Sequence, residues 1–139
     1  MEPVDWQHVI GIDDTAYSSQ SFDNYTEAVE FCQRNGGKVF EPTKRTNNPV
    51  FKWAKEKNSL NDIWLGIEWS KNESQFQYQS NGRRIRWSNF LSPSITNISC
   101  GERSCLNGDV AVVMSPQSGK WIVKRRYESY GYICETTVS

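Results

Sequence analysis

The number of cysteines in this chain indicates what chemistry they perform. An even count suits disulfide bonds, and the four are Cys32, Cys100, Cys105 and Cys134. A zinc site would need Cys100 and Cys105 to be accompanied by a second pair of Cys or His ligands, and the sequence has no such pair. The cysteines therefore predict a disulfide-bonded protein of an oxidising compartment, with no metal cofactor held by thiolates.

Catalytic chemistry has little support in the residue types present. His8 is the only histidine, and no serine or cysteine nucleophile motif lies near it in the sequence. The chain also has no phosphate-binding loop and no evident pair of catalytic carboxylates. We therefore expect His8 to be a structural residue and the protein not to be an enzyme.

Three Asn-x-Ser/Thr sequons indicate secretion. They begin at Asn24, Asn72 and Asn97 and would be glycosylated in a secreted protein. The polar N-terminus lacks the apolar stretch of a signal peptide, which fits either a cytosolic protein or a mature secreted form. The sequons and the even cysteine count favour the secreted, extracellular form. The longest apolar run, residues 110–114, falls far short of the ~20 residues that span a bilayer, so we expect no membrane insertion.

Two basic stretches are candidates for binding anions. They are Arg83-Arg84-x-Arg86 and Lys124-Arg125-Arg126, and arginine can grip an anionic group with two hydrogen bonds at once. One interpretation is a groove for sulfated or sialylated glycans. The other is that alternation along a strand places these side chains on solvated faces. Sixteen basic and sixteen acidic residues cancel, so nucleic acid is not an expected partner.

The first part of the chain is predicted to form a strand and a helix. Residues 8–12 are predicted to form a strand, and residues 13–21 a polar, turn-rich stretch. A helix capped by Asp23 or Asn24 follows. The pair Gly36-Gly37 ends it, before a short strand at residues 38–40. The buried face of this helix, at i, i+3, i+4 and i+7 spacing, consists of Tyr25, Ala28, Val29 and Cys32.

A second helix and a hairpin are predicted next. Asn48 is expected to cap the helix, with Pro49 in its first turn, where a missing N–H is harmless. A near-continuous apolar strand follows at residues 63–68. Alternating apolar residues over 76–87, interrupted by the turn residues Ser80-Asn81-Gly82, predict a hairpin. The buried stripe of the second helix consists of Val50, Trp53 and Ala54.

The last part of the chain predicts a long loop and three strands. Residues 88–108 have no periodicity and are expected to form an irregular loop, a type of segment that is usually functional. Strand-like runs follow at residues 110–114, 120–124 and 130–134. Helices followed by a loop-rich antiparallel half predict an α+β fold. Because no repeat or linker appears, we expect one domain over residues 1–139.

In this order of elements and in four local motifs, the chain resembles the C-type lectin-like domain family, in its short form, from about Val9 to Glu135. The motifs are the helix pattern from Tyr25 to Cys32; the core strand Trp64-Leu65-Gly66-Ile67; the hairpin from Phe76 to Phe90; and the ending Gly119-Lys120-Trp121 followed by Tyr132-Ile133-Cys134-Glu135.

The resemblance implies that one of the family's disulfides is present in this chain and that another is absent. The family's outer disulfide would join Cys32 to Cys134, closing a loop of about a hundred residues, worth ~4–5 kcal/mol in the chain-entropy model. The family's second disulfide would join the positions of Val110 and Arg126, and neither is cysteine. The remaining pair, Cys100 and Cys105, is expected to form a local staple in the long loop, with an interchain bridge as the alternative.

The resemblance also predicts that the family's sugar-binding calcium is absent. Calcium takes 6–8 oxygen ligands. In the family these come from a Glu-Pro-Asn or Gln-Pro-Asp triplet, a later acid, and an Asn-Asp pair after a tryptophan. Here those positions align with Ser92-Pro93-Ser94, Gly108 and Ile122-Val123. No calcium is therefore expected at the usual sugar site. An ancillary calcium elsewhere in the loops stays open, because Asp109 matches a position that often serves one.

A sugar site rebuilt without the ion is the resulting hypothesis. Its residues would offer hydroxyls, an acid, cations and aromatic faces, a mixture that suits a terminal N-acetylhexosamine (GlcNAc or GalNAc). The alternative for these residues is that they only hold the loop together. The expected ligand-binding residues are Ser92, Ser94, Asp109, Trp121, Lys124, Arg125 and Tyr127.

The sequence thus predicts a calcium-independent lectin whose partner is the carbohydrate of glycoconjugates. Because single sugar sites are weak and linked sites gain effective concentration, a homo- or heterodimer or a higher oligomer is expected. The alternative function is a protein-binding domain of the receptor or venom type, or an ice-binding domain, without sugar affinity.

Overall fold

The chain forms one mixed β-sheet flanked by two helices, so the α+β class expected from the sequence is confirmed. The computed structural model describes residues 4–58, 62–73, 75–91, 110–115 and 117–138. Within these residues the elements are β1 (Gln7–Val9), β2 (Ile12–Asp23), α1 (Tyr25–Arg34), β3 (Lys38–Val39), α2 (Asn47–Asn58), β4 (Ile63–Ser70), β5 (Gln75–Tyr78), β6 (Val110–Met114), β7 (Trp121–Arg125) and β8 (Tyr130–Thr137).

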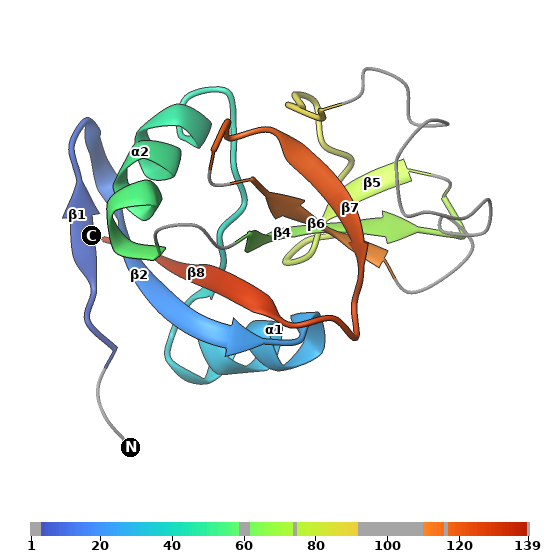
Figure 1. Ribbon diagram of the computed structural model, residues 1–139, viewed down its shortest axis with the longest axis horizontal. Coiled ribbons are helices and arrows are strands. Elements are labelled where there is room, and N and C mark those ends of the chain that lie inside the picture. The colour runs from blue at the N-terminus through green and yellow to red at the C-terminus, as the bar shows by residue number, and fades with distance from the viewer. Residues whose placement is uncertain (1–3, 59–61, 74, 92–109, 116, 139) are drawn as a thin grey trace.

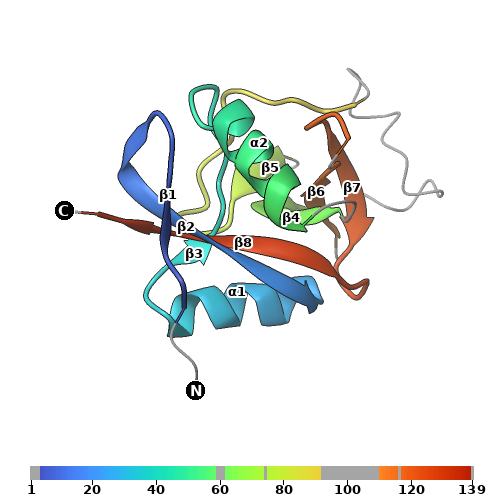
Figure 2. The same cartoon turned by 60° about the vertical axis from the view of Figure 1, so that its left-hand side comes forward.

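The sheet runs in the order β1-β2-β8-β4-β6-β7, with β3 paired to β8 and β5 paired to β4. The pair β4 and β8 is parallel, and the remaining described pairs are antiparallel. Figure 1 shows β8 crossing the middle of the molecule beside β2, and β7 next to β6 at the opposite edge of the sheet from β1. Figure 2 shows α1 and α2 on opposite sides of β2 and β8.

The first helix agrees with its sequence prediction. Asn24 is the N-cap, and its Oδ1 accepts a hydrogen bond of 2.9 Å from the backbone N–H of Glu27. The helix ends where Gly36 takes a positive φ of 84°. There the N–H of Gly37 donates to the carbonyl of Cys32 at 2.9 Å. The disulfide between Cys32 and Cys134 is present and ties α1 to β8.

The prediction for residues 13–21 was wrong, because they belong to the long strand β2. The strand pairs with β8 from Thr15↔Thr137 to Gln20↔Tyr132, and with β1 across a turn at Gly11, whose φ is 91°. The strand has many polar side chains, most of them exposed or only partly buried, so it lacks the regular alternation of apolar residues that predicts a strand. A pairing partner more than a hundred residues away supplies the backbone hydrogen bonds, and local periodicity cannot show that partner.

The second helix starts earlier than predicted, so Asn48 is not its cap. It begins at Asn47, whose N–H donates to the carbonyl of Thr43 at 3.0 Å. Thr43 and Thr46 hold the turn before the helix, since the N–H of Thr43 donates to Thr46 Oγ1 at 2.9 Å. Asn48 is exposed, whereas Asn47 is fully buried and has a partner elsewhere in the fold. Pro49 lies in the first turn, as expected.

Two apolar clusters fill the two sides of the sheet. One includes Val50 and Ala54 of α2, and the other includes Ala28 and Cys32 of α1. No helix in the described part of the chain is long and apolar enough to cross a membrane.

The hairpin predicted over residues 76–87 is present, but its second arm is not a regular strand. The turn is closed by the N–H of Gly82 donating to the carbonyl of Tyr78 at 2.9 Å. Beyond it, the two arms are joined by an isolated bridge between Gln77 and Arg84 and by hydrogen bonds from Tyr78 N–H to the Arg83 carbonyl and from Ile85 N–H to the Phe76 carbonyl. Residues 83–91, called the return segment below, therefore run along the edge of β5 in an irregular conformation.

Candidate functional site

A chain of aromatic rings lies beneath the return segment and joins it to the sheet. Trp69 of β4 contacts Phe76 of β5 with ring centroids 4.9 Å apart, and Phe76 contacts Phe90 at 4.9 Å. Phe90 contacts Trp121 of β7 at 5.4 Å, and Trp121 contacts Trp87 at 5.6 Å. Because these rings come from β4, β5, β7 and the return segment, they hold that segment at a defined position.

Trp121 differs from its expected place in the ligand site. Its side chain is 1% exposed, and its Nε1–H donates to Oδ1 of Asn47 at 2.9 Å. Its backbone N–H donates to the carbonyl of Asn89, and its carbonyl accepts from the N–H of Leu91, both at 2.9 Å. The indole thus fastens α2 and the return segment to β7, and no face of its ring is open to a dissolved ligand.

Three other expected site residues lie at the end of β7 and in the turn after it. Lys124 is half-buried, with its Nζ 5.9 Å from the centroid of the Tyr130 ring. The backbone N–H of Arg125 donates to a carboxylate oxygen of Glu128 at 3.2 Å. Tyr127 is 76% exposed, the largest exposure of any aromatic residue among the described ones. The strand and its turn therefore bring two cations and one open aromatic face to the same end of the sheet.

The remaining expected site residues, Ser92, Ser94 and Asp109, lie outside the described residues. So do Cys100, Cys105 and the sequon residue Asn97. Val110, the first described residue after that segment, pairs with Arg125. The strand register thus connects the end of the long segment to the end of β7, where Lys124, Arg125 and Tyr127 lie.

The residues at the family's Asn-Asp calcium-ligand positions do not fit a calcium ion. Val123 is fully buried, and Ile122 packs against the apolar cluster that contains Ala28 and Cys32. Neither side chain has an oxygen atom, and calcium binds oxygen ligands. In the described part of the chain, no group of three or more His, Cys, Asp or Glu residues could hold a metal ion.

Arg126 occupies the position where the resemblance places one cysteine of the second disulfide. Its Nε–H donates to the carbonyl of Val110, the other position of that disulfide, at 3.3 Å. Its guanidinium also forms an ion pair with Glu68 at 3.4 Å and lies 5.2 Å from the ring centroid of Tyr25. The Tyr25 hydroxyl donates to the same Glu68 oxygen at 3.1 Å. A polar network therefore connects β6 to the end of β7 without a covalent bond.

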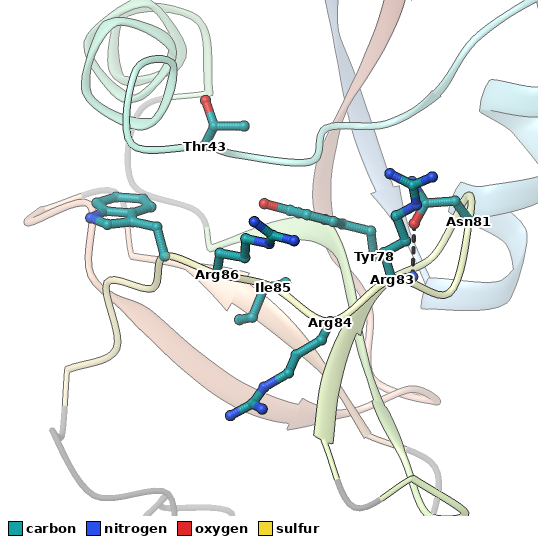
Figure 3. A pocket seen from close by; sticks show the side chains of 8 residues that line it. Thr43, Tyr78, Asn81, Arg83, Arg84, Ile85 and Arg86 are labelled. Carbon is teal, nitrogen blue, oxygen red and sulfur yellow. Dashed lines mark hydrogen bonds between the residues drawn. The ribbon is translucent and has the colours of Figure 1, made fainter.

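A groove of about 1050 Å³ opens between the return segment and the loop before α2. Arg83, Arg84 and Arg86 are exposed. In the view of Figure 3, Arg83 and Arg86 extend on the side of Tyr78, and Arg84 extends to the opposite side of the segment. The groove is lined by Thr43, Tyr78, Asn81, Arg83, Arg84, Ile85, Arg86 and Trp87.

The hairpin beneath the groove is fastened to the chain before α2. The Tyr78 hydroxyl donates to the carbonyl of Pro42 at 3.0 Å. The N–H and hydroxyl of Ser80 both donate to the carboxylate of Glu41, each at 2.9 Å. Burial, together with the charges of Glu41 and Glu135, raises the pKa of Tyr78 above its ordinary value, so this hydroxyl stays protonated and able to donate. The walls of the groove are thus connected by hydrogen bonds to buried groups.

Glu135 and Glu41 form a buried acidic pair behind this hairpin. Glu135 is 8% exposed and accepts a hydrogen bond of 3.0 Å from the backbone N–H of Glu41. Lys38 forms an ion pair of 2.9 Å with Glu41. Burial raises the pKa of Glu135 to about 7, although the Glu41 N–H and the Lys38 charge act in the opposite direction.

Only one wall of the groove, the one formed by the arginines, was predicted from the sequence. The arginine run was recognised as a candidate for binding anions. Thr43 was not recognised as a site residue. It lies at the groove because the fold brings together segments 36 residues apart, as the hydrogen bond from Tyr78 to Pro42 shows. Of the two described sequon asparagines, Asn24 is the half-buried cap of α1, and Asn72 is exposed in the turn after β4.

Comparison with known proteins identifies the family of this fold. A sequence model of the family described as "Lectin C-type domain" matches residues 21–136. A search of curated protein sequences found no match.

Solved structures show the same fold at low sequence identity. The human scavenger receptor C-type lectin carbohydrate-recognition domain is 16% identical, with a TM-score of 0.75 and coverage of 99% of this chain and 100% of that one. The C-type lectin CEL-I from Cucumaria echinata is 14% identical, with a TM-score of 0.74 and coverage of 97% and 96%. The cow carbohydrate-recognition domain of CD23, crystallised in the presence of a GlcNAc2Man3 oligosaccharide, is 17% identical, with a TM-score of 0.72 and coverage of 100% and 98%.

Proposed function

This chain belongs to the C-type lectin domain family, and from that membership we propose that it is a carbohydrate-binding lectin that acts without calcium. Its ligands would be terminal N-acetylhexosamines, GlcNAc or GalNAc. The same membership supports a binding protein rather than an enzyme. Lectin domains of similar fold include one crystallised in the presence of an oligosaccharide that contains GlcNAc.

Calcium independence rests on one observation above the others. The two family ligand positions that follow Trp121 are filled by Ile122, which is partly buried against an apolar cluster, and by Val123, which is fully buried. Neither side chain has an oxygen atom. The remaining ligand positions align with Ser92, Ser94 and Gly108, which have no carboxylate or amide. A site of this composition cannot supply the 6–8 oxygens that calcium prefers without a different set of residues.

The ligand class follows from the side chains at the same end of the sheet. Tyr127 presents an open aromatic face, and such a face can stack on the apolar C–H side of a sugar ring or on an acetamido methyl group. Lys124 and Arg125 are hydrogen-bond donors for sugar hydroxyls or the acetamido carbonyl. Ser92, Ser94 and Asp109 would add hydroxyl and carboxylate groups.

Secretion and oligomer formation complete the proposal. The disulfide between Cys32 and Cys134 suits an oxidising compartment, and the sequons at Asn24 and Asn72 are at or near the surface. A dimer or higher oligomer would raise the avidity of single sugar sites, which are weak on their own.

The test is glycan-array binding in EDTA by the wild type and by a Tyr127→Ala variant. We expect the wild type to bind arrays of terminal GlcNAc or GalNAc, and Tyr127→Ala to weaken that binding about tenfold. Phe22→Ala is the matched control, because Phe22 is also an exposed aromatic residue, at 56% exposure, and lies in β2. Sugar binding by the wild type that Phe22→Ala and Tyr127→Ala weaken equally would contradict the proposed site. No sugar binding at all would favour the protein-binding alternative.

A further inference from the structure

We propose that the groove between Thr43 and the return segment is a second binding site, for sulfated saccharides. It is separate from the site proposed above, because its lining includes none of Lys124, Arg125 and Tyr127. The inference does not depend on N-acetylhexosamine binding. It rests on three observations: the charge of the groove, the rigidity of its walls and the aromatic residues in its lining.

The charge of the groove is not neutralised by the protein. Among the described residues, no carboxylate forms an ion pair with the guanidinium group of Arg83, Arg84 or Arg86. Other cations of this chain do have acidic partners: Arg126 pairs with Glu68 at 3.4 Å, and Arg45 pairs with Asp14 at 3.2 Å. All three arginines line the groove, and the side chains of Arg83 and Arg86 extend on its Tyr78 side (Figure 3), so these two guanidinium groups are available to an external anion. A guanidinium donates two parallel hydrogen bonds to a sulfate or carboxylate group.

The backbone that carries these arginines is held in place. The N–H of Tyr78 donates to the carbonyl of Arg83 at 2.9 Å, and the N–H of Arg83 donates to Oδ1 of Asn81 at 2.8 Å. At the other end, Trp87 stacks edge-on against the buried Trp121 with centroids 5.6 Å apart. Less conformational entropy is lost on binding when the backbone that carries the binding groups is already ordered, so only the arginine side chains have to be ordered by the anion.

The aromatic lining favours a saccharide over a bare anion. Tyr78 and Trp87 line the same groove as the arginines, and aromatic faces pack against the apolar faces of sugar rings. Nucleic acid also combines phosphate with stacking bases. However, its recognition relies on an extended basic surface, and this chain has a formal net charge of zero. A sulfated saccharide fits the short basic groove better.

The experiment compares two triple variants of equal charge. Arg83→Gln, Arg84→Gln and Arg86→Gln together remove three positive charges from the groove. Lys52→Gln, Lys57→Gln and Lys71→Gln together remove three charges from exposed residues that do not line it. The probe is a heparin-derived octasaccharide, and its dissociation constant is measured by isothermal titration calorimetry in EDTA. We expect the arginine variant to bind at least about tenfold more weakly than the wild type, and the lysine variant to bind within about twofold of it.

Two further probes define the ligand, and one control separates the two sites. The desulfated octasaccharide should bind at least about tenfold more weakly than the sulfated one. A single-stranded oligonucleotide of matched charge should not compete. Equal loss of affinity in the two triple variants, equal binding of the desulfated probe, or stronger binding of the oligonucleotide would each overturn the proposal. Because all six substituted residues are exposed, both variants should fold, which circular dichroism checks. N-acetylhexosamine binding in the arginine variant should be unchanged, so that failure of one site is distinguishable from failure of the other.

Discussion

At the residue scale, Arg126 shows how this chain connects two strands where the resemblance expects a disulfide. Its guanidinium contacts the Val110 carbonyl, the Glu68 carboxylate and the Tyr25 ring. The side chains of Arg126 and Glu68 are only 29% and 20% exposed, so solvent screens the pair weakly. Removing Arg126 would leave the Glu68 charge partly buried without its cation.

We therefore predict that Arg126→Ala lowers the free energy of unfolding by about 2 kcal/mol. Chemical denaturation with urea measures this change. Arg83→Ala is the control, because Arg83 is exposed and has no acidic partner among the described residues, and it should change stability by less than about 0.5 kcal/mol. Equal effects of the two substitutions would show that the Arg126 network does not stabilise the fold.

The ionisation of Glu135 should make the stability of the fold depend on pH. Its pKa is raised to about 7 by burial, from an ordinary value of 4.5. The folded state therefore binds this proton more tightly than the unfolded state. The stabilisation is complete below about pH 4.5 and is lost as the pH rises through about 7. The Glu135→Gln variant keeps an oxygen for the Glu41 N–H and cannot ionise, so at pH 8 it should be more stable than the wild type by up to about 3 kcal/mol. Urea unfolding at pH 4.5 and pH 8 tests this, and a constant difference between the two proteins across that range would contradict it.

At the element scale, α1 depends on its cap. Asn24 accepts the hydrogen bond that the first turn of the helix would otherwise lack, so Asn24→Ala should lower the free energy of unfolding by about 1 kcal/mol. Asn24→Asp should retain most of that stability, because a carboxylate accepts the same bond. Both substitutions remove the sequon, so their difference, measured by thermal unfolding, reports the capping carboxylate, that is, its hydrogen bond and its charge at the helix N-terminus. Equal losses in the two variants would mean that the cap contributes nothing.

The elements also show which features of the sequence predict structure. The first helix was found with both ends, because its cap, its apolar spacing and its terminal glycines are all local signals. The strand β2 was missed because its partner β8 is distant in sequence and its outer side chains are polar. The start of α2 was displaced because Asn47, not Asn48, makes the buried hydrogen bond to Trp121. That contact joins residues 74 positions apart.

At the scale of the whole molecule, four short motifs were enough to identify the fold, and the family match over residues 21–136 agrees with them. The candidate site was harder to predict. Lys124 and Arg125 end β7 and Tyr127 lies in the turn after it, and their role in binding a ligand stays a prediction. Trp121 proved to be core, since only the packed structure shows that α2 and the return segment cover it. The arginine groove likewise depends on Tyr78 reaching Pro42 across the fold.

The central claim is that this lectin domain binds its sugar without calcium. The most direct measurement is the dissociation constant for a polymer that carries terminal N-acetylglucosamine or N-acetylgalactosamine, determined on one preparation in calcium and again in EDTA. Because Ile122 and Val123 replace the ion's ligands with apolar side chains that have no oxygen atom, the two constants should agree within about twofold. Loss of binding in EDTA would contradict the account, because it would mean that residues outside those positions hold a calcium ion that the sugar requires.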